Sequence, residues 1–159
     1  MEKSNLNVLA LDLGTKTGWA VRRRDGTIGY GTEKFASRSG RHAGLRWTEY
    51  RRWLSDIIVA EHVSQIAYED VKNHAGTLAA HCYGGFLSMT EMVAQQHNVT
   101  LVAFGVGTIK RAWAGKGNAD KAAMIAEAHR RGFNPADDNT ADALAILHLA
   151  LMALAREAA

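Results

Sequence analysis

The first 35 residues alternate apolar runs with turn residues in the pattern of antiparallel strands. Residues 6–13 (LNVLALDL) are almost continuously apolar, which is typical of a strand buried on both faces. Residues 14–18 (GTKTG) predict a turn, and residues 19–22 predict the strand that returns from it. The hairpin dipeptide Asp25-Gly26 then precedes a strand over residues 27–35. We therefore expect three consecutive antiparallel strands.

The rest of the chain changes to helical spacing, interrupted by two short strands. Helices are expected over residues 42–62 and 77–97, and each is followed by a strand, over residues 64–71 and 99–104. This order predicts a mixed sheet with helices packed on it, an α/β domain. The remaining expected elements are a short helix over 108–113, a helix over 119–131 with Asn118 as its cap and Gly132 as its stop, and a last helix, capped by Asp138 or Asn139, that runs to about Glu157.

Composition fits one soluble domain over residues 1–159. The chain has 159 residues and a mass of 17.3 kDa, and its 47% of apolar residues can build a core. The single cysteine, Cys82, excludes a disulfide framework and a cysteine-rich zinc module. No run reaches the roughly 18 apolar residues of a membrane span, and the first residues lack the apolar core of a signal peptide. We therefore expect a cytoplasmic protein with no membrane partner.

Two carboxylates lie on strands where apolar residues would be less costly. Asp12 is near the end of the first apolar strand. Glu69 lies beside Asp70 on the strand expected over residues 64–71. An ionised carboxylate in such a place costs several kcal/mol unless a cation or hydrogen-bond donors compensate it. Alternation along the strand exposes one of Glu69 and Asp70 without indicating which. The structural alternatives are that Asp12 caps the following turn and that Glu69 lies on a solvated edge strand.

Two further carboxylates open the last helix. Asp138 and Asp142 are four residues apart and can point the same way, ahead of a segment that is apolar almost all round. The N-terminal end of a helix also favours ionised carboxylates. The alternative is that Asp138 is an ordinary cap and Asp142 an ordinary acid of the first turn.

Together, Asp12, Glu69, Asp138 and Asp142 could converge on one site. Four negative charges within a few ångströms would repel one another, and two divalent cations would balance them formally. Ligands that offer only oxygen select a hard ion, Mg²⁺ or Mn²⁺. Two such ions about 4 Å apart form the clamp that is used for in-line phosphodiester hydrolysis. The acids therefore predict a two-metal nuclease site.

Basic residues supply a matching anionic substrate. The net charge is +3 and the pI about 9.2, which by themselves are weak indications of nucleic acid. Residues 115–121 (GKGNADK) form a loop that enters a helix, and backbone N–H groups with flanking lysines at such a place suit a phosphate backbone. The pattern of a nucleotide P-loop is missing. The candidate DNA-binding residues are Lys16, Lys72, Lys110, Lys116 and Lys121.

Four motifs give the chain a resemblance to a known family. They are LALDLGTKTGWAV at the first strand, AYEDV at the second acidic strand, GKGNADKAAMI in the basic loop and DDNTADALAIL at the last helix. In these motifs the sequence resembles the RuvC family of Holliday-junction resolvases, within the RNase H-like superfamily, and looks most like the bacteriophage branch. The resemblance covers residues 6–149. It implies a five-stranded RNase H-like sheet with helices on both faces, a homodimer, and Mg²⁺-dependent nicking of a four-way DNA junction.

The resemblance also implies roles for single residues. Asp12 and Glu69 match the first and second metal-binding acids and Asp142 the last, while Lys116 and Lys121 match basic residues beside the scissile strand. Many bacterial members have an acid or His where this chain has Asn139, so Asp138 is the candidate for the fourth ligand. Bacterial members also carry an aromatic wedge near the place of Lys72, and phage-type members could cut a wider set of branched DNA.

The proposed reaction is hydrolysis of the phosphodiester to 5′-phosphate and 3′-hydroxyl ends. Three other functions stay open from the sequence. The chain could be an RNase H-like nuclease that acts on RNA or RNA–DNA hybrids, or a junction-binding protein without activity. A phosphotransferase of the actin and sugar-kinase type is the third, because DLGTKTG resembles its phosphate-binding hairpin, but that fold needs a second such hairpin.

Overall fold

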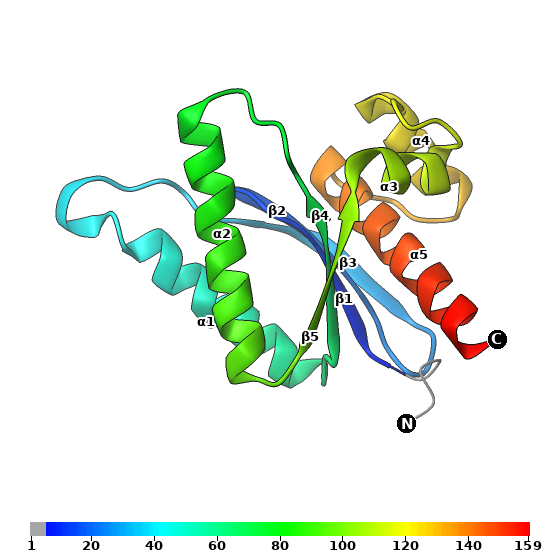
Figure 1. The fold of residues 1–159 in the computed structure, drawn as a ribbon, viewed down its shortest axis with the longest axis horizontal. Helices are drawn as coiled ribbons and strands as arrows, with labels where there is room; N and C mark the ends of the chain where they lie inside the picture. Colours follow the sequence, from blue (N-terminus) through cyan, green and yellow to red (C-terminus); the bar gives the residue numbers. More distant parts are fainter. Residues whose placement is uncertain (1–5) are drawn as a thin grey trace.

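The computed structural model describes residues 6–159 and places five strands of this range in one sheet, in the order β3-β2-β1-β4-β5 (Figure 1). β1 pairs antiparallel with β2, and β2 with β3, whereas β4 lies parallel to both β1 and β5. This arrangement confirms the expected mixed sheet that begins with three antiparallel strands. The strands are β1 (Val8–Asp12), β2 (Lys16–Arg22), β3 (Ile28–Lys34), β4 (Gln65–Asp70) and β5 (Thr100–Gly105).

Helices cover both faces of the sheet, as expected. α1 and α2 pack on one face, and α3, α4 and α5 pack on the other (Figure 1). Within residues 6–159, no helix combines the length and the apolar character needed to cross a bilayer. The helices are α1 (Leu45–Ala60), α2 (Thr77–Gln96), α3 (Val106–Ala114), α4 (Lys121–Arg130) and α5 (Asp138–Ala158), with a short 3-10 turn, η2 (Gly40–His42), before α1.

The central strand divides its side chains between two cores. Val8 and Ala10 of β1 pack under α5, while Leu9 and Leu11 face α1 and α2. This follows from the alternation of side chains along a strand, and all four side chains are fully buried. The apolar run that marked β1 in the sequence is therefore explained by burial on both faces.

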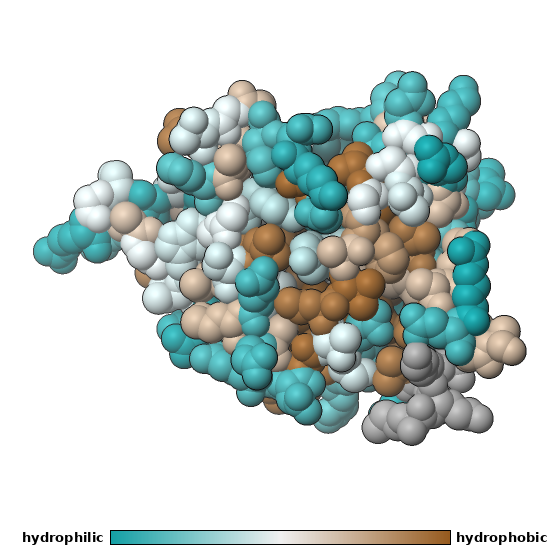
Figure 2. Space-filling view, viewed as in Figure 1, coloured by the Kyte–Doolittle hydropathy of each residue, from teal (hydrophilic) through white to brown (hydrophobic). Residues whose placement is uncertain are grey.

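β5 forms one edge of the sheet. In Figure 2, apolar side chains gather over the part of the surface where Figure 1 places this strand. Leu101 packs partly against the core under α1 and α2, and Phe104 packs partly against the core under α5. The strand thus presents half-buried apolar residues along an edge whose outer backbone groups have no strand partner within the described chain.

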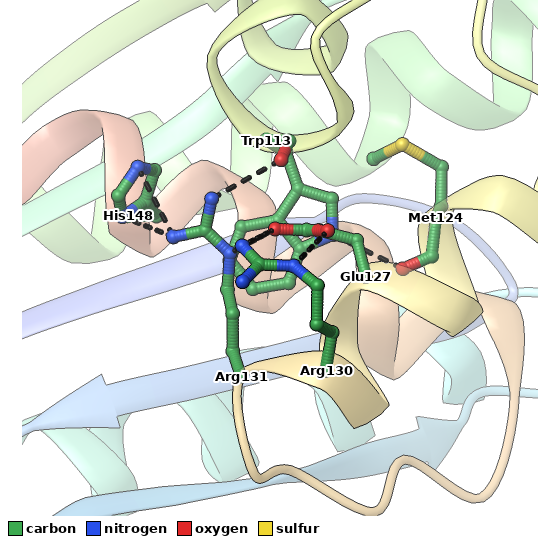
Figure 3. A network of polar contacts seen from close by, with 6 residues as sticks. All are labelled: Trp113, Met124, Glu127, Arg130, Arg131 and His148. Atoms are coloured by element: carbon green, nitrogen blue, oxygen red, sulfur yellow. Dashed lines mark hydrogen bonds and ion pairs between the residues drawn. The ribbon is translucent and has the colours of Figure 1, made fainter.

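A polar network joins the three helices on the α5 face (Figure 3). The guanidinium of Arg131 donates to the Trp113 carbonyl (3.1 Å), forms an ion pair with Glu127 (2.7 Å) and lies 4.3 Å from the Trp113 ring centroid. It also lies 3.2 Å from Nδ1 of His148 on α5. Burial, and then Arg131, lower the pKa of His148, which favours a neutral ring beside the guanidinium. The network holds α3 and α4, which carry Lys110 and Lys121, against α5.

Three local expectations were wrong. β2 begins at Lys16, inside the expected turn over residues 14–18, and the Thr17 hydroxyl donates to the Gly14 carbonyl (2.7 Å). α4 is capped by Asp120 rather than Asn118, since the Asp120 carboxylate accepts from the Ala123 N–H (2.8 Å). α5 is capped by Asp137, one residue before Asp138 and two before Asn139, the two expected caps. In both helices the cap is the residue whose backbone is extended and whose side chain reaches a free N–H.

Candidate active site

Asp12 and Glu69 end up side by side at the ends of two parallel strands. The register pairs Leu11 with Tyr68, so the next residues along β1 and β4 are Asp12 and Glu69. Alternation places both side chains on the face covered by α5, the face of Ala10 and Ala67.

The neighbouring Asp70 points the other way. Its side chain is 43% exposed and lies 3.8 Å from the ammonium of Lys72, which is itself 80% exposed. The structure thus resolves the choice that alternation left open, since Glu69 is the acid on the side of Asp12. It also leaves Lys72 with Asp70, on the side away from the other acids.

A glycine on β2 allows the start of α5 to approach Asp12. Gly18 is the register partner of Asp12. A Cβ at position 18 would lie 1.9 Å from the carbonyl oxygen of Asn139, far inside van der Waals contact. The backbone of the first turn of α5 therefore rests directly on the β2 backbone, next to Asp12. No motif in the sequence marked Gly18 as more than a turn residue.

The cap of α5 is hydrogen-bonded to β3 at the residue that continues the register row of Asp12 and Gly18. Thr32 is the register partner of Gly18, and its hydroxyl lies 2.8 Å from both Oδ1 of Asp137 and the hydroxyl of Thr140. The same carboxylate accepts from the Thr140 N–H (2.8 Å). Burial raises the pKa of Asp137, but these hydrogen bonds outweigh it and hold that pKa below its usual value. Sequence reasoning missed this tether, although Asp137 is of a residue type that is preferred as a helix cap.

The two acids of α5 face the strand acids and two lysines. Oδ2 of Asp138 lies 2.7 Å from the ammonium of Lys121, whose side chain is 82% exposed. Asp142 lines a small cavity of about 100 Å³ together with Glu69 and Lys110. The structure therefore brings all four candidate acids to one end of the sheet, under the start of α5.

The Asp12 carboxylate feels the charge of Lys121 but is not paired with it. Within residues 6–159, no hydrogen bond or ion pair reaches its side chain. Burial raises the pKa of Asp12 well above its usual value. The charges of other acids, in order Asp142, Glu69, Asp138 and Asp137, raise it further.

The pKa values of the neighbouring acids are raised as well. Burial, followed by the charges of Glu69 and Asp138, raises the pKa of Asp142 to about 7, against the opposing effect of Lys110 and Lys121. Burial also raises the pKa of Glu69, and Lys110 opposes it. The two lysines thus offset only part of the repulsion between the acids.

The donor chemistry of this cluster fits a hard divalent cation. Its side chains offer only carboxylate oxygens, which Mg²⁺ and Mn²⁺ prefer, and a cation would relieve the repulsion that raises the pKa of Asp12 and Asp142. As the side chains stand, no three His, Cys, Asp or Glu residues in the described part of the chain are gathered into a group that could hold a metal ion. The acids therefore match a divalent cation in donor type and in charge, but their side chains are not spaced as a formed metal site.

The five candidate lysines separate into four groups, one of which is Lys72 beside Asp70. Lys110 and Lys121 lie with the acids, as described above. Lys16 lines an open hollow of about 340 Å³ with Thr32, Asp137 and Thr140, and its charge helps to lower the pKa of Asp137. Lys116 is exposed in the loop after α3, where its carbonyl accepts from the Ala119 N–H (3.2 Å).

Solved structures share this fold. The chain superposes on T. thermophilus RuvC in complex with a Holliday junction substrate with a TM-score of 0.80 and 23% identity, over 95% of this chain and 96% of that one. A second T. thermophilus RuvC structure gives a TM-score of 0.71 and 23% identity, over 93% and 95% of the two chains. The crystal structure of the yeast mitochondrial Holliday junction resolvase Ydc2 gives 0.67 and 14% identity, over 96% and 80%. No protein-family model and no curated protein matches the chain. The fold is therefore the RuvC-like form of the RNase H fold.

Proposed function

We propose that this chain is a structure-selective endonuclease that resolves four-way DNA junctions and other branched DNA by metal-dependent hydrolysis. The observation that carries the proposal is the convergence of Asp12, Glu69, Asp138 and Asp142 under the start of α5, where no hydrogen bond or ion pair from residues 6–159 reaches the Asp12 carboxylate. The likeness in fold to junction resolvases supports the choice of DNA substrate.

The four acids would hold two Mg²⁺ ions, for which Mn²⁺ could substitute. When bound, such ions polarise the scissile phosphate and activate water for in-line attack, which leaves 5′-phosphate and 3′-hydroxyl ends. Asp12 is central, because the charges of all the neighbouring acids act on it. Lys110 and Lys121, which already lie against the acids, would contact the phosphates on either side of the cut.

Lys16, Lys72 and Lys116 would bind DNA at a greater distance from the acids. Lys16 lies beside the cap of α5, while Lys72 and Lys116 are exposed on other loops. We expect their replacement to weaken binding without changing the rate of nicking at saturating DNA, because a phosphate contact that is kept through the reaction contributes equally to the ground and transition states.

A labelled four-way junction tests the proposed activity. With Mg²⁺ or Mn²⁺ we expect nicks in two opposed strands, and none with EDTA. Asp12→Asn should abolish nicking and keep junction binding. Asp70→Asn is the matched control, because Asp70 lies on the same strand as Glu69 but points away from the acids. Faster cleavage of an RNA–DNA hybrid than of the junction would contradict the choice of substrate and support the alternative RNase H-like nuclease.

We also propose that the protein acts as a homodimer, since a junction presents two related strands to be cut. The half-buried apolar residues along the free edge strand β5, Leu101 and Phe104 among them, are the surface that supports a second copy. Light scattering of the purified protein should give twice the chain mass of 17.3 kDa. A mass of one chain, at concentrations where the junction is nicked, would contradict the dimer.

The bacteriophage branch of the family and a cytoplasmic location are further parts of the proposal. The four sequence motifs and the position of Lys72 near the place of the aromatic wedge support the phage branch, and the single cysteine suits a reducing compartment. Comparison of nicking on junctions, forks and plain duplexes tests the wider selectivity that we expect of this branch. Cleavage confined to the four-way junction would contradict it.

A further inference from the structure

The connection between β3 and α1 forms an arm that stands out from the rest of the molecule. We call residues 36–45 the basic arm. Nine consecutive residues of it, 37–45, are exposed. In Figure 1 this segment, coloured cyan, extends past α1 and α2, and Figure 2 shows a hydrophilic projection in the same place. Such exposure over nine residues leaves the arm without a core of its own.

The base of the arm is nevertheless fixed. Phe35, which precedes it, is buried in an aromatic cluster, 5.1 Å from the ring of Tyr50 between centroids. Arg46, which follows it, donates to the Phe35 carbonyl (3.0 Å) and to the hydroxyl of Thr15 (3.1 Å). Thr15 lies in the turn between β1 and β2, three residues after Asp12. The arm is thus attached at the end of the sheet that carries the acids.

The positive charge of the protein is concentrated on the arm and its flanks. Residues 34–52 contain six of the 19 Lys and Arg residues but one of the 16 Asp and Glu residues, with His42 in addition. The rest of the chain carries 13 basic and 15 acidic residues. The net charge of +3 therefore originates in this segment, because the remainder is slightly negative.

Four arginines of this segment have no partner among the residues that the structure describes. Arg38, Arg41, Arg51 and Arg52 are exposed, and no hydrogen bond or ion pair is formed by their side chains with any residue of the range 6–159. Some arginines elsewhere differ, since Arg23 makes two hydrogen bonds to Glu61 (2.6 and 2.8 Å), whereas Arg111 and Arg156 are also exposed without a hydrogen bond or ion pair to residues 6–159. Unpaired guanidinium groups on a projecting surface are free to contact an external anion in two-point geometry.

We propose that the basic arm, with the exposed arginines of α1, is a second DNA-binding surface that holds a duplex arm of the junction by its phosphates. This inference rests on the proposed function. Most of the side chains are of the kind that contacts phosphates: Arg38 lines an open hollow with Ser37 and Ser39, and a second hollow is lined by Arg51 and Arg52 with Thr48, Ser55, Gln96 and one acid, Asp56. The surface has no acid of the cluster, so it contributes affinity and not chemistry.

A duplex is favoured as the partner by the position of the arm. Lys34, the last residue of β3, is the register partner of Lys16, and the pair continues the basic surface from the cap of α5 to the arm. A DNA that is cut at the acids and extends across β2 and β3 would meet first these lysines and then the arm. Separate contacts on one rigid molecule raise the affinity for branched DNA, because the second contact is intramolecular.

The test compares two double variants that lose the same charge. Arg38→Ala with Arg41→Ala removes two unpaired arginines of the arm. Arg130→Ala with Arg156→Ala is the control, at exposed positions on α4 and α5 away from the arm. Junction affinity is measured over a series of salt concentrations, and nicking is measured at saturating DNA. For the arm variant we expect weaker binding, a log–log salt dependence that is shallower by about two units, and an unchanged nicking rate.

Each other result has a defined meaning. Suppose that the wild type nicks the junction and that the arm variant binds it with the same affinity and salt dependence as the wild type. The arm proposal is then overturned and the proposed function is kept. Equal losses in the two variants would also overturn it, because the effect would then follow total charge. If the wild type neither binds nor nicks any branched DNA, both proposals fail together. Tighter binding of phosphatidylserine vesicles than of DNA by the arm would assign the surface to membranes instead.

Discussion

Asp142 is one of the acids whose ionisation ties the stability of the protein to pH, with Asp12 and Glu69. Its pKa is raised to about 7 in the folded protein, against an ordinary value of 3.8. A group with a raised pKa stabilises the folded state while it is protonated, so this stabilisation is complete below the ordinary value and is lost as the pH rises to about 7. We expect the metal-free protein to unfold at a lower temperature at pH ~8 than at pH ~5. Asp142→Asn should remove part of that difference, as measured by circular dichroism in EDTA.

The same reasoning predicts how Mg²⁺ acts on stability. An ion that binds only the folded protein raises its unfolding temperature, and this rise should be smaller in Asp142→Asn than in the wild type because one ligand is neutral. Asp70→Asn, at the exposed neighbouring acid, should behave as the wild type in both measurements. An equal response to Mg²⁺ in all three proteins would remove Asp142 from the set of proposed ligands.

Gly18 is the residue that allows α5 to reach the sheet. In Gly18→Ala the new Cβ would meet the Asn139 carbonyl at 1.9 Å, so the start of α5 has to move and with it Asp138 and Asp142. We expect a loss of about 1–3 kcal/mol in the free energy of unfolding, as for overpacked cores, and a loss of nicking. Urea unfolding and the junction assay measure the two effects.

Gly84→Ala is the matched control, because the Cβ added at this position of α2 would meet no atom within 4 Å. Its effect on stability should be neutral or favourable by up to about 1 kcal/mol, since alanine is the better helix former. Full activity and full stability in Gly18→Ala would mean that α5 can shift without consequence, contrary to the close approach in the structure.

Two helices with the same kind of cap differ in what the cap does for the site. Asp137 caps α5 and Asp120 caps α4, each by accepting a backbone N–H at 2.8 Å. Within residues 6–159, Asp137 is bonded to the sheet, through Thr32, and Asp120 is not. We expect Asp137→Ala and Asp120→Ala to lower the free energy of unfolding by similar amounts, about 0.5–2 kcal/mol. Nicking at saturating DNA should fall in Asp137→Ala and stay close to normal in Asp120→Ala.

Thr32→Val provides the complementary test of that tether. It keeps the shape of the β3 side chain and removes the hydroxyl that joins Asp137 and Thr140. If nicking falls while the helix content is unchanged, the cap is kept and the effect is assigned to the position of α5. Equal activity of the two cap variants would show that the cap acts on stability alone.

At the level of elements, the hydrophobic pattern was sufficient to predict which helices and strands exist and their order along the chain, but not the residues at which they begin and end. The strand around Asp12 was predictable because burial on both faces demands an apolar run. The turn over residues 14–18 was predicted too long because Thr17 and Gly18 are turn formers locally, and their pairing with β1 and β3 is a long-range property. The caps were displaced by one or two residues, since the run of Asp and Asn before α5 offers several acceptors and only the backbone selects one.

At the level of the whole molecule, the convergence of the acids was predictable and its support was not. Carboxylates on a buried strand and at the start of an apolar helix stand out in the sequence because burying an ionised carboxylate is unfavourable. A shared site with cations would compensate that free-energy cost, so the sequence predicted that they converge. Thr32 is separated from Asp137 by 105 residues, so no local pattern could connect them. The unpaired state of Arg38 and Arg41 likewise became visible only with the positions of all the described acids.

The division of β1 between two cores also makes a prediction about the whole chain, which we propose is a single domain. Val8 and Ala10 belong to the core under α5, and Leu9 and Leu11 to the core under α1 and α2, so neither core can open without losing half of the strand that the other requires. Both cores should therefore unfold in one transition. In Trp113→Phe, the remaining tryptophans pack partly against the α1 and α2 core, so their emission reports that face, while far-UV circular dichroism reports all helices. The two urea midpoints should coincide. A separate, earlier midpoint for the emission would mean that the faces fold as distinct units and that the sheet alone does not couple them.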